Sequence, residues 1–153
     1  MEGVIFLERR ITQMINKGLM SSNSSEWATP VNFFNELNKE FNFTLDPCAT
    51  KENAKCKKYY TKEDNGLTKE WNGERVFCNP PYGREIQYWV KKCYEEHNKN
   101  NTFIVMLLPA RTDTSYFHDY IYKKQEIRFI KGRLKFNDGK NPAPFPSMVV
   151  IFK

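Results

Sequence analysis

Apolar residues recur at helical spacing in three stretches of the chain. Thr29 and Pro30 precede the first stretch, and we expect Thr29 to cap a helix whose first position is Pro30. Each stretch predicts a helix with one buried face. The apolar positions are Phe33, Phe34, Leu37 and Phe41 in the first, Ile86, Trp89, Val90, Cys93 and Tyr94 in the second, and Tyr116, Phe117, Tyr120 and Ile121 in the third.

Short apolar runs between these stretches predict β-strands. They cover residues 43–45, 75–78, 103–108, 127–130 and 148–152. The central run is apolar throughout, which is typical of a strand covered on both faces. No helix is expected between the last two strands. The order predicts an α/β fold in three layers, with a mostly parallel sheet and an antiparallel C-terminal hairpin.

Two proline-stopped segments follow the first two predicted strands. They are Asp46-Pro47 and Asn79-Pro80-Pro81-Tyr82. Proline cannot donate to a ladder of strand hydrogen bonds, so the chain must turn at both places. Ligands of open α/β sheets bind at the carboxyl ends of the strands. We therefore expect both segments on one functional rim.

The N-terminal residues differ from the rest of the chain. Residues 1–20 carry a short amphipathic pattern, and residues 21–25 read Ser-Ser-Asn-Ser-Ser. We interpret residues 1–25 as an amphipathic extension on a polar linker, and residues 26–153 as one folded domain. Docking on the body, self-association and contact with a partner all remain open for the extension.

Charge is distributed unevenly along the 153 residues. The formal net charge is +6, and 40% of the residues are hydrophobic, which is enough for a packed core. Residues 1–78 hold 11 basic and 11 acidic side chains, whereas residues 79–153 hold 13 basic and 7 acidic ones. A concentrated excess of this kind suits a polyphosphate partner such as nucleic acid, and a solvated basic surface is the alternative.

The sequence also indicates the compartment. The longest apolar run, Phe103 to Leu108, is far shorter than the roughly 20 residues of a membrane span. Glu2 and Glu8 stand where a signal peptide would be basic. We expect a soluble cytoplasmic protein without membrane contact. The four cysteines fit no common zinc spacing, so we expect reduced thiols and no metal site.

Asn79-Pro80-Pro81-Tyr82 is the most specific motif. The prolines stiffen the turn and remove two amide donors, which leaves the carbonyls of Asn79 and Pro80 without local partners. A side-chain oxygen and a main-chain carbonyl can together accept both hydrogens of an amino group. Such acceptors would favour methyl transfer from a sulfonium to a planar amine, and Tyr82 offers a face for stacking. A rigid structural turn is the alternative.

Two acidic residues are candidates for contacts with a nucleoside cofactor. Asp46 ends the first predicted strand, where open sheets often place a carboxylate against a ribose. Asp64 lies in Lys-Glu-Asp-Asn-Gly, and a contact with ribose or adenine and a simple turn role before Gly66 are equally consistent with its position.

Taken together, several motifs in this order resemble the phage-type DNA N-6-adenine methyltransferases, a Dam-like family. The similarity runs from about Glu26 to the C-terminus. The motifs are Trp27-x-Thr29-Pro30, Phe33-Phe34, Leu45-Asp46-Pro47-Cys48-Ala49, Asn79-Pro80-Pro81-Tyr82-Gly83, residues 108–114, Gly132-Arg133-Leu134-Lys135-Phe136 and Ala143-Pro144-Phe145-Pro146-Ser147.

The resemblance implies an enzyme with a Rossmann-like methyltransferase sheet that uses S-adenosylmethionine to methylate adenine in double-stranded DNA. Its catalytic motif would be Asn79, Pro80, Pro81 and Tyr82. The cofactor would be bound by Thr29, Pro30, Asp46, Pro47, Cys48, Ala49, Asp64 and Asn79. Arg111, Lys131, Arg133 and Lys135 would contact DNA phosphates, with a surface ion pair as the alternative for Arg111.

The chain differs in two respects from most other adenine methyltransferases. Cys48-Ala49-Thr50-Lys51 replaces the usual Gly-x-Gly turn, so the cofactor is expected to sit differently or to bind weakly. No segment is long enough for a separate target-recognition domain. Selectivity for the target sequence would then come from loops or from a second subunit, or it would be low. A homodimer is therefore a further possibility.

Two other functions agree with the same motifs. One is a methyltransferase acting on DNA cytosine N-4, on an RNA base or on a protein side chain, because the chemistry at the motif is nearly the same for all planar amines. The other is a basic nucleic-acid-binding module with a degenerate cofactor site, which the missing glycines suggest.

Overall fold

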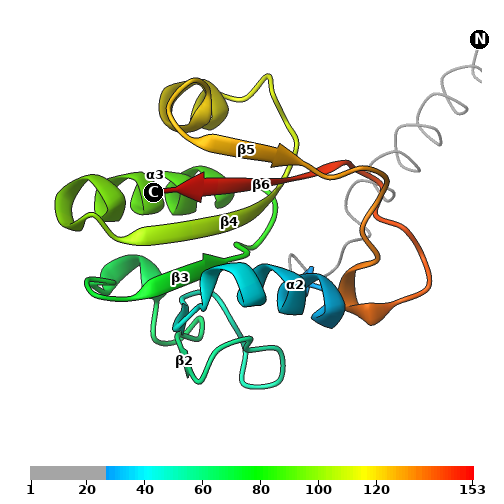
Figure 1. Cartoon of the computed structure of the whole chain (residues 1–153), viewed down its shortest axis with the longest axis horizontal. Helices are drawn as coiled ribbons and strands as arrows, with labels where there is room; N and C mark the ends of the chain where they lie inside the picture. The colour runs from blue at the N-terminus through cyan, green and yellow to red at the C-terminus, as the bar shows by residue number, and fades with distance from the viewer. Residues whose placement is uncertain (1–26) are drawn as a thin grey trace, which may run out of the picture.

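The computed structural model describes residues 27–153, which form a six-stranded sheet in the order β2-β1-β3-β4-β6-β5 (Figure 1). The strands are β1 (Leu45–Asp46), β2 (Lys58–Tyr59), β3 (Arg75–Cys78), β4 (Phe103–Pro109), β5 (Glu126–Phe129) and β6 (Ser147–Phe152). The amphipathic extension predicted for residues 1–25 lies outside the described residues.

The sheet is mostly parallel and ends in an antiparallel hairpin, as predicted. β1 pairs in parallel with β2 and β3, and β3 pairs in parallel with β4. β6 runs antiparallel to both of its neighbours, β4 and β5. β5 therefore has the direction of β4, and all strands except β6 end at the same rim.

Alternation along β4 separates two hydrophobic layers. Ile104, Met106 and Leu108 pack on the face covered by helix α3 (Ile86–Asn100). Val105 and Leu107 pack on the face covered by helix α2 (Val31–Phe41). Both faces of a central strand must be apolar in such an arrangement. The three-layer, Rossmann-like α/β fold is confirmed.

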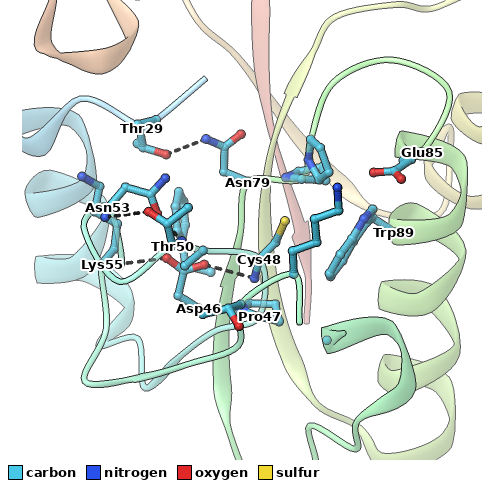
Figure 2. A pocket seen from close by; sticks show the side chains of 18 of the residues that line it. Thr29, Asp46, Pro47, Cys48, Thr50, Asn53, Lys55, Asn79, Glu85 and Trp89 are labelled. Carbon is cyan, nitrogen blue, oxygen red and sulfur yellow. Dashed lines mark hydrogen bonds between the residues drawn. The ribbon is translucent and has the colours of Figure 1, made fainter. Parts of the chain in front are cut away.

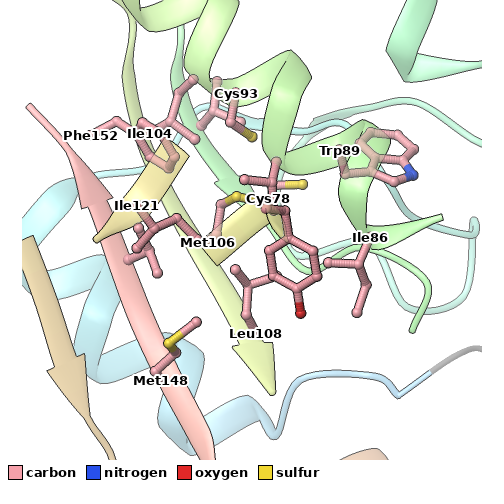
Figure 3. Packing of buried hydrophobic residues seen from close by; sticks show 14 of the residues in the cluster. Cys78, Ile86, Trp89, Cys93, Ile104, Met106, Leu108, Ile121, Met148 and Phe152 are labelled. Carbon is pink, nitrogen blue, oxygen red and sulfur yellow. The ribbon is translucent and has the colours of Figure 1, made fainter. Parts of the chain in front are cut away.

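Helix α3 supplies the larger part of one layer. Ile86, Trp89 and Cys93 face the sheet and lie beside Cys78 of β3 (Figure 3). The other contributor to this layer is η2 (Phe117–Ile121), a five-residue π-helix. It occupies the place of the third predicted helix, and its Phe117 and Ile121 are buried as the pattern requires.

Helix α2 begins one residue later than predicted, and the prediction of Thr29 as its cap is wrong. Pro30 occupies the cap position, without a side-chain cap hydrogen bond. The amide of Val31 instead donates to Asp138 Oδ1 at 3.0 Å. The Thr29 hydroxyl makes no cap hydrogen bond and instead accepts one from Asn79.

The sequence pattern did not predict β2. This strand has two residues, and its bonds to β1 involve the backbone alone, which the identities of Lys58 and Tyr59 do not reveal. Two short 3₁₀ turns, η1 (Gly66–Thr68) and η3 (Phe136–Asp138), complete the described elements. No helix within residues 27–153 has the length and apolar character needed to cross a membrane.

Candidate active site

A cavity of about 750 Å³ opens at the carboxyl ends of β1 and β3 (Figure 2). Asp46 and Asn79 both line it, so the two proline-stopped segments share one site as expected. The remaining walls come from segments that lie far apart in the sequence. They are residues 27–29, 47–53, Lys55, residues 61–63 and 65–67, Phe77, Pro80, Pro81, Glu85, Tyr88 and Trp89.

Asp46 is a buried carboxyl group at the end of β1. Asp46 is only 4% exposed to solvent. Burial raises the pKa of Asp46 to about 7, against the opposing effect of hydrogen bonds from the amides of Lys55 and Cys48. The Lys55 amide donates to Oδ2 at 3.1 Å, and the Cys48 amide donates to Oδ1 at 3.4 Å.

The loop after Asp46 is closed by local hydrogen bonds. The Thr50 amide donates to Asn53 Oδ1 at 2.7 Å, and the Asn53 amide donates to Thr50 Oγ1 at 3.1 Å. Reciprocal bonds between side chains and backbone amides, as in a capping box, fix a loop without glycine. The backbone of residues 47–53 thereby keeps a defined course along the cavity wall although Gly-x-Gly is absent.

A glycine does approach this loop, but from elsewhere in the chain. A Cβ atom on Gly66 would lie 2.1 Å from the Pro47 carbonyl oxygen and 3.2 Å from the Trp89 ring. Only glycine permits this approach between the two backbones. The indole of Trp71, which is fully buried, donates to the Gly66 carbonyl at 3.1 Å and holds the segment in place.

Asn79 has a defined side-chain orientation. Its Nδ2 donates to the carbonyl of Trp27 at 2.5 Å and to Thr29 Oγ1 at 3.0 Å. The Trp27 carbonyl can only accept, so the amide nitrogen must face it. Oδ1 is buried, and nothing in residues 27–153 donates to it. A buried acceptor without a partner is costly, and it indicates a missing ligand group.

The two prolines and the tyrosine of the motif take different positions. Pro80 and Pro81 line the cavity, whereas Tyr82 does not. The Tyr82 ring packs against three aromatic rings, those of Trp27, Phe136 and Phe145, at centroid distances of 6.5, 6.0 and 5.4 Å. Its hydroxyl donates to the Leu107 carbonyl at 3.4 Å. Tyr82 therefore supports the motif from behind.

Comparison with known proteins identifies the family of this chain. The family model of DNA N-6-adenine-methyltransferase (Dam) matches residues 17–153. The DNA N-6-adenine-methyltransferase of Haemophilus phage HP1 (strain HP1c1) is 30% identical over 148 residues, which cover 92% of this chain and 85% of that protein. The chain belongs to the DNA N-6-adenine-methyltransferase family. A second relative, the DNA N-6-adenine-methyltransferase of Escherichia phage T1, is 36% identical over 110 residues, 71% of this chain and 45% of that protein.

Most cofactor residues expected for a Dam-family member meet in the cavity. Thr29, Asp46, Pro47, Cys48, Ala49 and Asn79 all line it. Pro30 and Asp64 do not line it, although the neighbours of Asp64 do. The exposed carboxylate of Asp64 accepts from the amide and the hydroxyl of Thr61 at 2.9 and 3.0 Å, the role of a turn residue.

The four basic residues expected to contact DNA lie outside the cavity lining. They are Arg111, Lys131, Arg133 and Lys135, all exposed. Arg111 follows β4, and the other three follow β5, so all four come after strand ends on the rim that carries Asn79. Within residues 27–153 Arg111 makes no salt bridge, in contrast to the alternative of a surface ion pair.

Three residues of this Dam-family site were not predicted. Gly66 and Asn53 shape the loop after Asp46, and their partners are recognisable only in the fold. Tyr88 lies at the first turn of α3, lines the cavity and is 57% exposed. An exposed aromatic beside a proline-rich turn was a usable signal. Among the described residues no three His, Cys, Asp or Glu side chains are grouped to hold a metal ion.

Proposed function

We propose that this protein transfers a methyl group from S-adenosylmethionine to the exocyclic amine of adenine in double-stranded DNA. Membership of the Dam family supports the methylation of adenine in DNA. The observation that carries the finer proposal is the buried Oδ1 of Asn79, which lacks a donor and belongs to a residue that lines the same cavity as Asp46.

The cavity suits the cofactor in size and in chemistry. Its volume of about 750 Å³ falls within the range of small-molecule sites. Asp46 would accept hydrogen bonds from ribose hydroxyls, and the backbone of residues 47–53, drawn close by Gly66, would follow the nucleoside. S-adenosylmethionine, when bound, supplies a methyl group on a positively charged sulfur.

Asn79 prepares the acceptor amine. Its Oδ1 would accept one hydrogen of the adenine amine, and the main-chain carbonyl of Pro80 would accept the other. These bonds favour a tetrahedral nitrogen and stabilise the positive charge that develops on it during attack. The bonds to Trp27 and Thr29 hold Oδ1 in place beforehand, so no reorganisation is needed during the reaction.

A base inside a duplex hides this amine, so the adenine must leave the stack at a cost of a few kcal/mol. We propose that Arg111, Lys131, Arg133 and Lys135 hold the flanking phosphates on the same rim. The Tyr88 ring, which is exposed at the cavity, would stack on the extruded base and offset part of that cost, whereas Tyr82 is packed behind the motif. The reaction would take place in the cytoplasm of a bacterial or phage-infected cell.

Nucleoside analysis tests the substrate. Duplex DNA and RNA are each incubated with the protein and methyl-labelled S-adenosylmethionine, then digested and separated by mass spectrometry. We expect the label in N6-methyldeoxyadenosine. Label in cytidine derivatives or in RNA would assign another amine. Its absence from both nucleic acids would leave a protein side chain as the acceptor, or a nucleic-acid-binding module without activity.

Asn79→Ala tests the mechanism. The variant loses the amine acceptor, and we expect turnover to fall about 10²- to 10³-fold, as on removal of an oxyanion-hole group. Calorimetry should still detect S-adenosylmethionine, since the Asp46 side is intact. Asn35→Ala, on the exposed face of α2, is the matched control and should retain full turnover. Unchanged turnover in Asn79→Ala would contradict the assignment.

A further inference from the structure

Asn137 clasps the segment that orients Asn79. The Asn137 amide donates to the Ala28 carbonyl at 2.8 Å, and the Ala28 amide donates to Asn137 Oδ1 at 2.9 Å. One residue therefore satisfies both backbone groups of Ala28. The two residues are 109 positions apart, so this pair joins the C-terminal loop to the start of the described chain.

Asn137 has a backbone conformation that few residues adopt. Its φ of 60° and ψ of 23° lie in the left-handed region, where asparagine and aspartate are enriched among residues with side chains. This conformation directs its amide and side chain to the same target. The next residue, Asp138, accepts from the Val31 amide at 3.0 Å, so the clasp continues into the first turn of α2.

The clasp reaches Asn79 through one more set of hydrogen bonds. Ala28 lies between Trp27 and Thr29, the two residues that accept both hydrogens of the Asn79 amide. The Trp27 ring is also held, with edge contacts to Phe136 and Phe145 at centroid distances of 5.6 and 5.2 Å. Displacing Ala28 would displace both acceptors of Asn79 together.

We propose that Asn137 is a positioning residue that fixes the direction of Asn79 Oδ1 through residues 27–29. The inference rests on the proposed methyl transfer at Asn79. Asn137 does not line the cavity, so it acts without touching cofactor or base. The loop that carries Lys131, Arg133 and Lys135 would then also hold the amine acceptor in register.

Three variants test the proposal by steady-state kinetics on duplex DNA. Asn137→Gly keeps the left-handed backbone and deletes Oδ1, and we expect kcat to fall about tenfold, since small misplacements of an acceptor are costly. The KM values for S-adenosylmethionine and DNA should change less than about twofold, because no ligand contact is removed. Asn137→Asp keeps an acceptor at the same place and should restore kcat.

Asn101→Gly is the matched control. Asn101 also has a positive φ, 54°, but it ends α3 away from the cavity. The same substitution there should leave kcat unchanged. If Asn137→Gly and Asn101→Gly unfold at the same urea midpoint, a lower kcat in Asn137→Gly alone reflects a misplaced Asn79 and not a less stable protein.

A second readout does not depend on activity. The side-chain amide signal of Asn79 in a nitrogen–proton NMR spectrum is identified by its loss in Asn79→Ala. We expect it to shift in Asn137→Gly, to return in Asn137→Asp and to stay in place in Asn101→Gly.

The results separate the two proposals. Native protein that forms no N6-methyladenine would refute the proposed function, whereas the NMR shift would still test the clasp. If the unsubstituted protein is active and Asn137→Gly keeps the same kcat, only the proposed positioning role of Asn137 would be overturned. A failure of Asn137→Asp to restore kcat would also overturn it, as would an equal loss in Asn101→Gly.

Discussion

The two strand ends that face the cavity are held in opposite ways. At the end of β1, the Asp46 carboxyl accepts from residues two and nine positions later in the chain. At the end of β3, the Asn79 amide donates to residues 52 and 50 positions earlier. The single residue between those two acceptors, Ala28, is in turn clasped by Asn137, 109 positions later.

This difference separates the two halves of the proposed reaction. The β1 end is shaped by the turns that follow Asp46 together with Gly66, and it forms the cofactor side of the proposed site, so changes there should alter cofactor binding. The β3 end has its shape only when the N-terminal and C-terminal segments meet, so changes there should alter turnover at saturating ligand. The variants below test the β1 half, from the largest expected effect to the smallest.

Asp46→Asn should change how stability depends on pH. The folded protein keeps a proton on Asp46 up to about pH 7, whereas the ordinary pKa is 3.8. Deprotonation of Asp46 therefore opposes folding. The free energy of unfolding of the unsubstituted protein should fall as pH rises from about 4 to about 7. Compared with Asp46→Asn, the unsubstituted protein should lose up to about 4 kcal/mol of unfolding free energy between pH 4 and 8. Urea unfolding at both pH values measures it.

Asp64→Asn is a control of opposite sign. Hydrogen bonds from Thr61 lower the pKa of Asp64, so its contribution to stability is present at neutral pH and is lost as pH falls through its folded-state pKa. If the stability of the unsubstituted protein did not fall with rising pH relative to Asp46→Asn, Asp46 would carry no proton at neutral pH in the folded state.

Gly66→Ala should damage the cofactor half alone. The new Cβ would overlap the Pro47 carbonyl, and relief of such overpacking typically costs about 1–3 kcal/mol. We expect calorimetric binding of S-adenosylmethionine to be lost, with the Asn79 amide signal unchanged. Gly73→Ala controls for backbone strain, because Gly73 has a φ of 80° but no atom within 4 Å of the added Cβ. Equal binding loss in both variants would contradict this explanation.

Asn53→Ala should have the smallest effect. It removes the acceptor for the Thr50 amide, and a hydrogen bond of this type contributes about 1 kcal/mol. The KM for S-adenosylmethionine should rise several-fold while kcat stays constant. A fall in kcat at saturating cofactor would remove the distinction between the two strand ends.

The sequence allowed the rim to be predicted because each strand end carries its own marker. Proline after Asp46 and after Asn79 stops a strand, and the parallel order brings the stops together. The membership in the Dam family followed from the same motifs. The roles of individual residues stay predictions, since cavity lining alone does not show binding.

The contacts that sequence reasoning missed join distant segments. Thr29 looked like a helix cap because Pro30 follows it, but its hydroxyl serves Asn79. Gly66 was interpreted only as part of a turn, since its contact with Pro47 depends on how β2 pairs with β1. Local propensity carries no information about such partners.

The place of β6 has a consequence for biosynthesis. β6 follows β4 and β5 in the chain, yet it lies between them in the sheet, and the clasp residues Asn137 and Asp138 precede it. A nascent chain can therefore neither close its sheet nor align Asn79 until these late segments have been synthesised. A chain truncated before them would lack an aligned Asn79, and the proposed methyl transfer would begin only after they have folded.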